Sequence, residues 1–157
     1  MKYSIYLFLL LISFSNCSKE ESTPPPLSPE ELLISSTWQL NKIQIQIPPD
    51  PGLTDVPRTG LEPCESDDSF RFFTGNKFLM NDGSISCNGS GRSVFWSVDG
   101  GTWKYTAQDS GIVIRRGLVE QPFKIVNISN TALTISQLSI DIFGQETLYL
   151  FNLTAKK

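Results

Sequence analysis

The chain has 157 residues, with 13 Lys and Arg, 16 Asp and Glu and no His, giving a net charge of −3. The absence of histidine excludes Ser-His-Asp and Cys-His catalytic arrangements and removes the commonest metal ligand. A mildly acidic chain with scattered Lys and Arg offers no basic face for nucleic acid. We therefore expect a non-enzymatic protein without a cofactor.

The N-terminal segment has the parts of a secretory signal peptide. A basic start precedes an apolar run at residues 5–12, which is too short to span a bilayer. Small residues then lead to Cys17, and this junction resembles the lipobox of bacterial lipoproteins, in which the cysteine is lipidated and becomes the mature N-terminus. We predict a lipoprotein signal peptide at residues 1–16. The alternative is a plain signal peptide cut near Asn16, with Cys17 an ordinary thiol.

A tether and a short helix follow the signal peptide. Residues 17–29 hold the lipidated cysteine and a charged, proline-rich segment, which is typical of an extended linker. Ser28 precedes a proline and stands three residues before Glu31, the spacing of a capping box. The pattern predicts a helix beginning here and places one folded domain at residues 30–157.

The rest of the chain alternates apolar and polar residues with turn signals between the runs. The first run changes its apolar phase between Leu40 and Ile43, which predicts a bulge inside one long strand. Gly75-Asn76 and Ser129-Asn130 are short turns. We predict eight strands, at residues 37–47, 69–74, 77–80, 101–106, 112–116, 123–128, 132–140 and 147–153.

Consecutive strands without a helix to cover one face form either a closed barrel or a sandwich. Sequential hairpins with one apolar face favour the barrel. The predicted fold is all-β, a single up-and-down eight-stranded barrel with a short N-terminal helix. The connections after the first and third strands, residues 48–68 and 81–100, are long and share one end of such a barrel.

The order of several short motifs resembles the lipocalin-like lipoproteins of Bacteroidota. These motifs are Ser36-Thr37-Trp38 after a helix, Cys64 ahead of Asp67-Asp68 and a Phe-rich strand, a second cysteine before Gly101-Thr102-Trp103, and a closing pattern Ile-x-x-Ile-Ser-x-x-x-Leu-Thr-Ile. The resemblance covers residues 30–153. It implies a small barrel on the cell envelope and says little about activity.

Cys64 and Cys87 remain once Cys17 is lipidated. An even pair in an exported chain predicts a disulfide, and the two residues lie in the two long connections that share a barrel end. A metal site is the alternative, which two isolated thiols without histidine disfavour.

The carboxylates of the first long connection are candidates for a cation site. Glu62, Glu65, Asp67 and Asp68 lack the spacing of a calcium loop. We favour a solvated turn in which Asp67 or Asp68 accepts backbone N–H bonds at the entry of a strand.

Four residues are the candidate ligand contacts. Phe95 and Trp96 lie in the second long connection, where aromatic side chains at a barrel mouth can contact a ligand; the alternative is a lid or added strand packed on the barrel. Arg115 and Arg116 end a strand toward the same end, and the pleat turns one of them inward, where it could receive a carboxylate or phosphate. Two solvated arginines are the alternative.

The sequence thus predicts a lipid-anchored envelope protein at the outer membrane, on the periplasmic or the surface leaflet. Its looped end would bind a small apolar or amphipathic ligand. The alternative is an accessory subunit that binds an envelope protein partner and has a filled barrel. An eight-stranded barrel accommodates either, so the fold alone does not decide.

Overall fold

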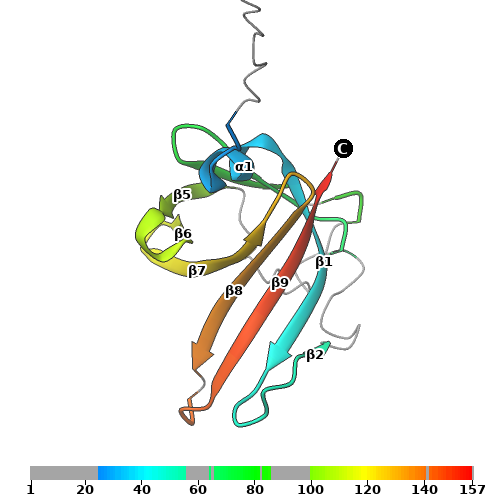
Figure 1. The fold of residues 1–157 in the computed structure, drawn as a ribbon, viewed down its shortest axis with the longest axis vertical. Coiled ribbons are helices and arrows are strands. Elements are labelled where there is room, and N and C mark those ends of the chain that lie inside the picture. Colours follow the sequence, from blue (N-terminus) through cyan, green and yellow to red (C-terminus); the bar gives the residue numbers. More distant parts are fainter. Residues whose placement is uncertain are drawn as a thin grey trace, which may run out of the picture.

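The strands close into an antiparallel barrel (Figure 1). The computed structural model describes residues 25–55, 64, 66–81, 83–85, 100–140 and 142–156. After helix α1 (Pro29–Ser35) come β1 (Thr37–Gln46), β2 (Thr54–Asp55), β3 (Ser69–Phe72), β4 (Lys77–Asn81), β5 (Gly101–Thr106), β6 (Gly111–Arg116), β7 (Val119–Ile128), β8 (Ala132–Ile140) and β9 (Glu146–Lys156). Neighbours pair in the order β1, β3 to β9, and a β1–β9 ladder closes the ring. This confirms the predicted eight-stranded up-and-down barrel, to which β2 is a two-residue addition on β1.

Helix α1 begins with the predicted capping box. The backbone N–H of Glu31 donates to Ser28 Oγ at 3.2 Å, and the backbone N–H of Ser28 donates to Glu31 Oε2 at 2.7 Å. These two bonds satisfy amide groups that a helix N-terminus leaves unpaired. The helix buries Leu33 completely, and the indole of Trp38 donates to the Leu33 carbonyl at 3.0 Å. The helix is therefore fixed to the start of β1.

The predicted bulge lies in β1, where the register against β9 shifts between Leu40 and Lys42. Leu40 and Ile43 are 2 % and 5 % exposed, although strict alternation would place residues three apart on opposite faces. The extra residue returns the apolar phase to the inside of the barrel.

Aromatic rings fill the inside of the barrel. The Phe72 ring lies 5.2 Å from both Phe78 and Trp103, measured between centroids, and Phe123 lies 6.0 Å from Phe151 in an edge-to-face contact. All five are at most 3 % exposed. These contacts give the lumen around them a packed aromatic core.

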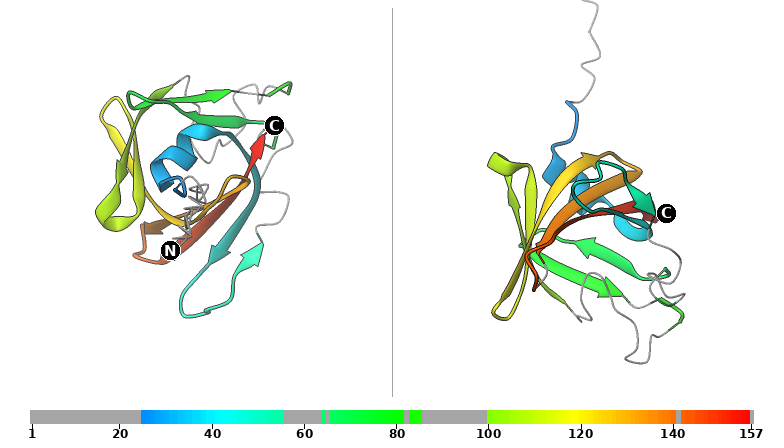
Figure 2. Two further views of the ribbon diagram at one scale, coloured as in Figure 1. Left: turned by 45° about the horizontal axis from the view of Figure 1, so that its top comes forward. Right: turned by 90° about the horizontal axis from the view of Figure 1, so that it is seen from below.

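The two ends of the barrel differ. Tight turns join β3 to β4, β5 to β6 and β7 to β8 at one end, and α1 packs there against β3 and β7. The left panel of Figure 2 shows α1 within the ring of strands at this end, which we call the closed end. The other four connections, after β1, β4, β6 and β8, share the opposite end, which we call the looped end.

Two elements differ from the sequence prediction. β2 was not predicted, because two residues carry no recognisable periodicity; it pairs with β1 where β3 no longer reaches. β7 begins at Val119, earlier than predicted, because Gly117 and Leu118 alone turn the chain from β6 into β7. The hairpin is tight where the sequence indicated a longer connection.

The signal peptide, Cys17 and most of the tether lie outside the described residues, as do Cys87, Phe95 and Trp96. In the described part of the chain, no helix is long and apolar enough to cross a membrane.

Candidate binding site at the looped end

The looped end carries a set of exposed apolar side chains that we call the apolar rim. Among the exposed large hydrophobic residues of the described chain, only Leu27 and Val126 lie toward the closed end. The rim comprises Ile47, Leu53, Ile85, Leu118, Val119, Ile142 and Phe143. Each of the four connections contributes to it, so the mouth of the barrel is bordered by apolar groups.

Tight turns between strands leave the most exposed rim residues in solvent. Gly117 has φ +55°, a conformation that glycine adopts without steric cost, and this turn leaves Leu118 98 % exposed. The hairpin between β8 and β9 presents Ile142 and Phe143, which are 93 % and 88 % exposed. Exposing such side chains to water is unfavourable, and several together mark a binding surface more than a folding requirement.

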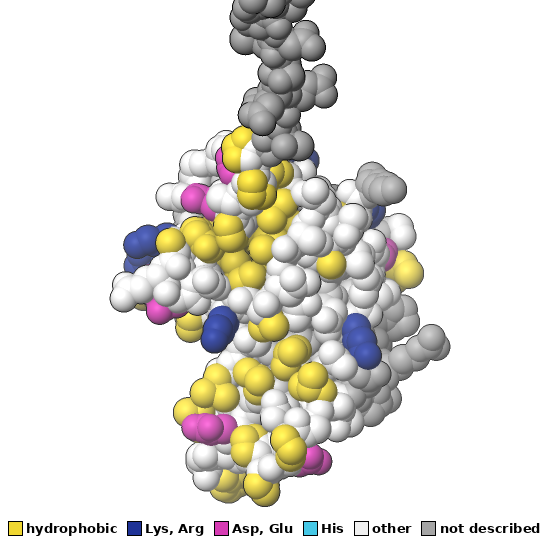
Figure 3. Space-filling model, viewed as in Figure 1, with side chains coloured by type: hydrophobic (Ala, Val, Ile, Leu, Met, Phe, Trp, Pro, Cys, Tyr) yellow, Lys and Arg dark blue, Asp and Glu magenta, His cyan; other side chains and the backbone are white. Residues whose placement is uncertain are grey.

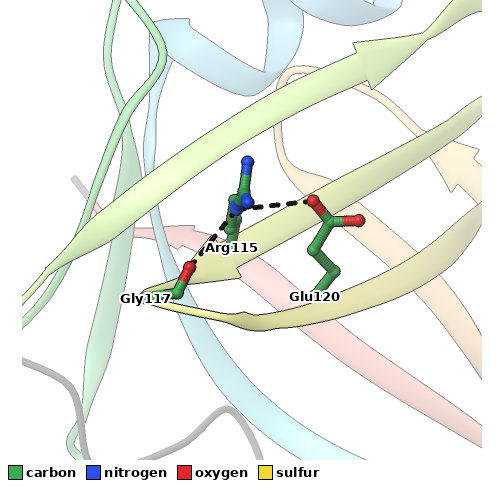
Figure 4. A network of polar contacts seen from close by, with 3 residues as sticks. All are labelled: Arg115, Gly117 and Glu120. Atoms are coloured by element: carbon green, nitrogen blue, oxygen red, sulfur yellow. Dashed lines mark hydrogen bonds and ion pairs between the residues drawn. The ribbon is translucent and has the colours of Figure 1, made fainter.

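The two candidate arginines occupy different positions beside this rim. Arg115 lies on the outer face, where its Nε is 3.4 Å from Glu120 Oε1 and donates to the Gly117 carbonyl at 3.3 Å (Figure 4). Arg116 follows the core-facing alternation of Ile112 and Ile114, as predicted for one of the pair, but β6 ends there and Arg116 is exposed. Arg115 thus braces the β6–β7 turn, and Arg116 is an exposed cation at the end of β6.

Asp67 ties the two long connections together. Its Oδ2 accepts hydrogen bonds from the backbone N–H groups of Ser84 and Ile85, at 2.6 and 3.0 Å, and from the Ser84 hydroxyl at 3.1 Å. The Ile85 bond is the main cause that holds the pKa of Asp67 below its ordinary value. The prediction of a carboxylate accepting backbone N–H bonds at a strand entry is confirmed. We call Asp67 with residues 83–85 the loop clamp.

Cys64 lies three residues before this clamp and is 8 % exposed. Cys87 follows Ile85 by two residues and lies outside the described residues. The disulfide between them stays a prediction, and so do the ligand contacts assigned to Phe95 and Trp96.

Gln121 is a further candidate polar contact for a ligand, and it was not predicted from the sequence. It alternates with Phe123 and Ile125 on the core-facing side of β7, opposite Ile114. Its Oε1 is buried and has no hydrogen-bond partner in the described structure. The sequence signal for this residue is a polar side chain at a position where the alternation of the strand is apolar. The predicted strand begins at residue 123, so Gln121 falls outside it.

Among the described residues, no group of three His, Cys, Asp or Glu side chains lies close enough together to bind a metal ion.

Comparisons with known proteins add a likeness in strand arrangement. No family model and no curated protein matches this chain. It is similar to a solved structure of bovine odorant binding protein with undecanal, at 18 % identity and a TM-score of 0.46, over 86 % of this chain and 77 % of that one. A complex of bovine odorant binding protein with a selenium-containing odorant gives 18 % identity, a TM-score of 0.44, and coverage of 86 % and 78 %. The barrel assignment rests on the strand pairing itself.

Proposed function

We propose that this protein is a lipid-anchored binding protein of the bacterial cell envelope whose looped end takes a small apolar or amphipathic ligand. The observation that carries the proposal is the apolar rim, to which all four connections of one barrel end contribute. Apolar walls with a few polar groups are typical of small-molecule sites. Arg116 at the mouth would receive an anionic head, and Phe95 and Trp96 would add apolar contacts.

The anchor fits this arrangement. Pro25 and α1 lie before β1 at the closed end, so a tether from a lipidated Cys17 would join the barrel opposite the rim. Two or more acyl chains would hold the protein firmly in the outer membrane, since one chain binds only marginally. Replacing Cys17 with Ser should release the protein from the membrane fraction. A variant that still sediments with membranes, together with native protein lacking acyl mass, would exclude lipidation.

The disulfide is proposed on the same surface. The clamp holds residues 67 and 85 together, and in the sequence Cys64 precedes Asp67 by three residues and Cys87 follows Ile85 by two. Non-reducing peptide mapping of protein from the envelope should recover the two cysteines linked; free thiols at both positions would refute the bond.

Ligand binding is tested by calorimetric titration of the mature protein with palmitate. Phe143→Ser should weaken binding by about tenfold, because it removes an apolar contact worth roughly 1–2 kcal/mol. Val126→Ser is the matched control, since Val126 is exposed but lies away from the rim. Binding that is absent in the wild type, or equally weakened by both variants, contradicts a ligand site at the rim.

The packed aromatic core favours the second candidate, an accessory subunit that binds an envelope protein. Native mass spectrometry of the protein purified from its membrane separates the two. A retained small molecule supports the first proposal, and a stoichiometric protein partner without one supports the second.

A further inference from the structure

Strand β8 has one edge that no strand covers in the described structure. Its ladder with β9 runs through to Ile140, opposite Glu146. Its ladder with β7 ends much earlier, at the pair of Lys124 and Ser136. Residues 137–140 are therefore paired on one side only among the described strands.

The cause of the gap lies in β7. A bulge between Ile125 and Asn127 shifts its register against β8, and bulges bend the strand that contains them. The part of β7 before Lys124 pairs with β6 alone. Pro122 sits in this part, and a proline, which has no N–H to donate, fits a strand that is unpaired on one side.

The two edges of the gap are protected unequally. Edge strands in natural proteins are normally blocked by proline, charge or irregularity, because open edges recruit other strands. The β7 edge has Pro122, whereas residues 137–140 of β8 read Gln-Leu-Ser-Ile, without proline, glycine or charge. The β8 edge is therefore competent to accept another strand.

A groove accompanies this edge on the outer face. It has a volume of about 820 Å³, and its walls include Val113 of β6, Pro122 of β7, Leu138 of β8 and Leu148 of β9. Figure 3 shows hydrophobic side chains gathered over the lower parts of β8 and β9, on the face seen in Figure 1. Leu138 and Ile140 in this patch are 55 % and 61 % exposed. The groove also reaches the core-facing Ile112 and Phe123 through the gap between β7 and β8. It is distinct from the barrel mouth, because none of the rim residues lines it.

Charges mark the ends of the edge. Lys124 lies at the upper end, where the ladder with β7 stops, and it lines the groove. Asp109, in the β5–β6 turn, lines the same end. Glu146 is exposed near the lower end, on β9, where it pairs with Ile140 on the covered side of β8. A strand placed antiparallel to β8 would begin near Glu146, which favours a basic residue first, and would end beside Lys124 and Asp109, whose opposite charges favour neither sign.

We propose that β8 and this groove form a strand-addition site for an extended segment of a partner protein. The segment is about four residues long, apolar at alternate positions, with a basic N-terminal end. Its backbone pairs with residues 137–140, and its apolar side chains lie on Leu138, Ile140 and Leu148. A fatty acid would leave the backbone groups of the edge without partners, so a polypeptide fits the site better. This site does not depend on ligand binding at the rim.

The probe is the peptide acetyl-Lys-Val-Thr-Val-Thr-amide, titrated calorimetrically into the mature full chain. Its control is the same peptide N-methylated at alternate amides on the edge that would face β8, which removes backbone donors and keeps the side chains. We expect binding of the first peptide and a loss of about tenfold or more for the second, since ladder hydrogen bonds carry affinity in strand addition. No binding up to about 1 mM, or equal binding of both peptides, overturns the proposal.

Two variants locate the site. Leu138→Lys places a charge on the edge and should weaken peptide binding by about tenfold, as charged residues block edges. Val126→Lys is the matched control, because Val126 is 53 % exposed against 55 % for Leu138. Unchanged binding in Leu138→Lys overturns the site. Light scattering of the protein without peptide tests whether the site instead binds a second copy of this chain. A dimer that Leu138→Lys dissociates would show that it does, and would overturn the proposal of a different partner protein.

Discussion

The closed end and the looped end of the barrel are formed by the same strands, but one end buries its apolar side chains and the other exposes them. At the closed end, Leu33 and Trp38 are fully buried and α1 covers the opening. At the looped end, Leu118 and Phe143 are exposed, and the carboxylates of Asp67 and Asp68 accept backbone N–H bonds that hold two connections together. One end is built for stability and the other presents surface, a division that is common where loops on a rigid scaffold carry function.

The largest expected effect falls at the closed end. Trp38→Ala removes a fully buried aromatic side chain and its bond to Leu33, so unfolding free energy should fall by about 3–5 kcal/mol. Phe143→Ala at the looped end should change it by less than about 0.5 kcal/mol, since the ring is 88 % exposed. Urea denaturation of both variants measures the contrast. Comparable losses would show that the looped end is as much a part of the core as the closed end.

The second effect concerns the loop clamp. A Cβ on Gly83 would overlap the Asp67 carboxylate, so Gly83→Ala should displace it and destabilise the fold by about 1–3 kcal/mol. In an Asp67→Ala background the overlap is gone, and the same change should cost little. The double-mutant cycle by urea denaturation reports this coupling. Equal costs in the two backgrounds would mean that Gly83 acts independently of Asp67.

A smaller effect is expected at the helix cap. Ser28→Ala removes the acceptor for the Glu31 amide and should cost about 1 kcal/mol. Ser28→Asp keeps an acceptor oxygen and should restore most of the loss. If neither variant changes the denaturation midpoint, α1 is held by Leu33 and Trp38 alone.

Elements with local rules could be predicted from the sequence. The capping box at Ser28, the bulge after Leu40 and the turn at Gly75-Asn76 each depend on residues close in the chain, and all three are present. The turn shows this directly, because Gly75 and Asn76 both have positive φ, at 79° and 66°. Local stereochemistry suffices for such elements.

Features that depend on distant strands could not be predicted in this way. The free edge of β8 exists because β7 stops pairing with β8 at Ser136, and the sequence of residues 137–140 does not itself predict this. The rim residues were missed for a similar reason: Leu118 and Phe143 are apolar like core residues, and only the placement of their turns leaves them exposed. Pro122 was the one sequence signal of the gap, through its missing N–H.

The smallest expected effect is the acid response, which compares one carboxylate from each end. The pKa of Glu31 is lowered mainly by the backbone N–H of Ser28, and that of Asp67 mainly by the backbone N–H of Ile85. A folded pKa below the unfolded one means that the stabilisation is present above the unfolded pKa and is lost as the pH falls through the folded value. Both losses therefore begin below about pH 4.5, and that of Glu31 begins first because Glu has the higher ordinary pKa.

The test is to measure the denaturation midpoint at a series of pH values from 6 to 3, in steps on the order of half a pH unit. Asp67→Asn should flatten the lower part of the acid limb, which is the fall of the denaturation midpoint as the pH decreases. The Asn amide does not titrate, and its oxygen accepts the backbone N–H bonds less strongly than a carboxylate. Glu31→Gln should flatten the upper part, while still bonding to Ser28. If Asp67→Asn leaves the acid limb of the wild type unchanged, protonation of Asp67 does not loosen the loop clamp. The two long connections would then be held by other groups, of which a Cys64–Cys87 disulfide, insensitive to acid, is the first to examine by repeating the titration under reducing conditions.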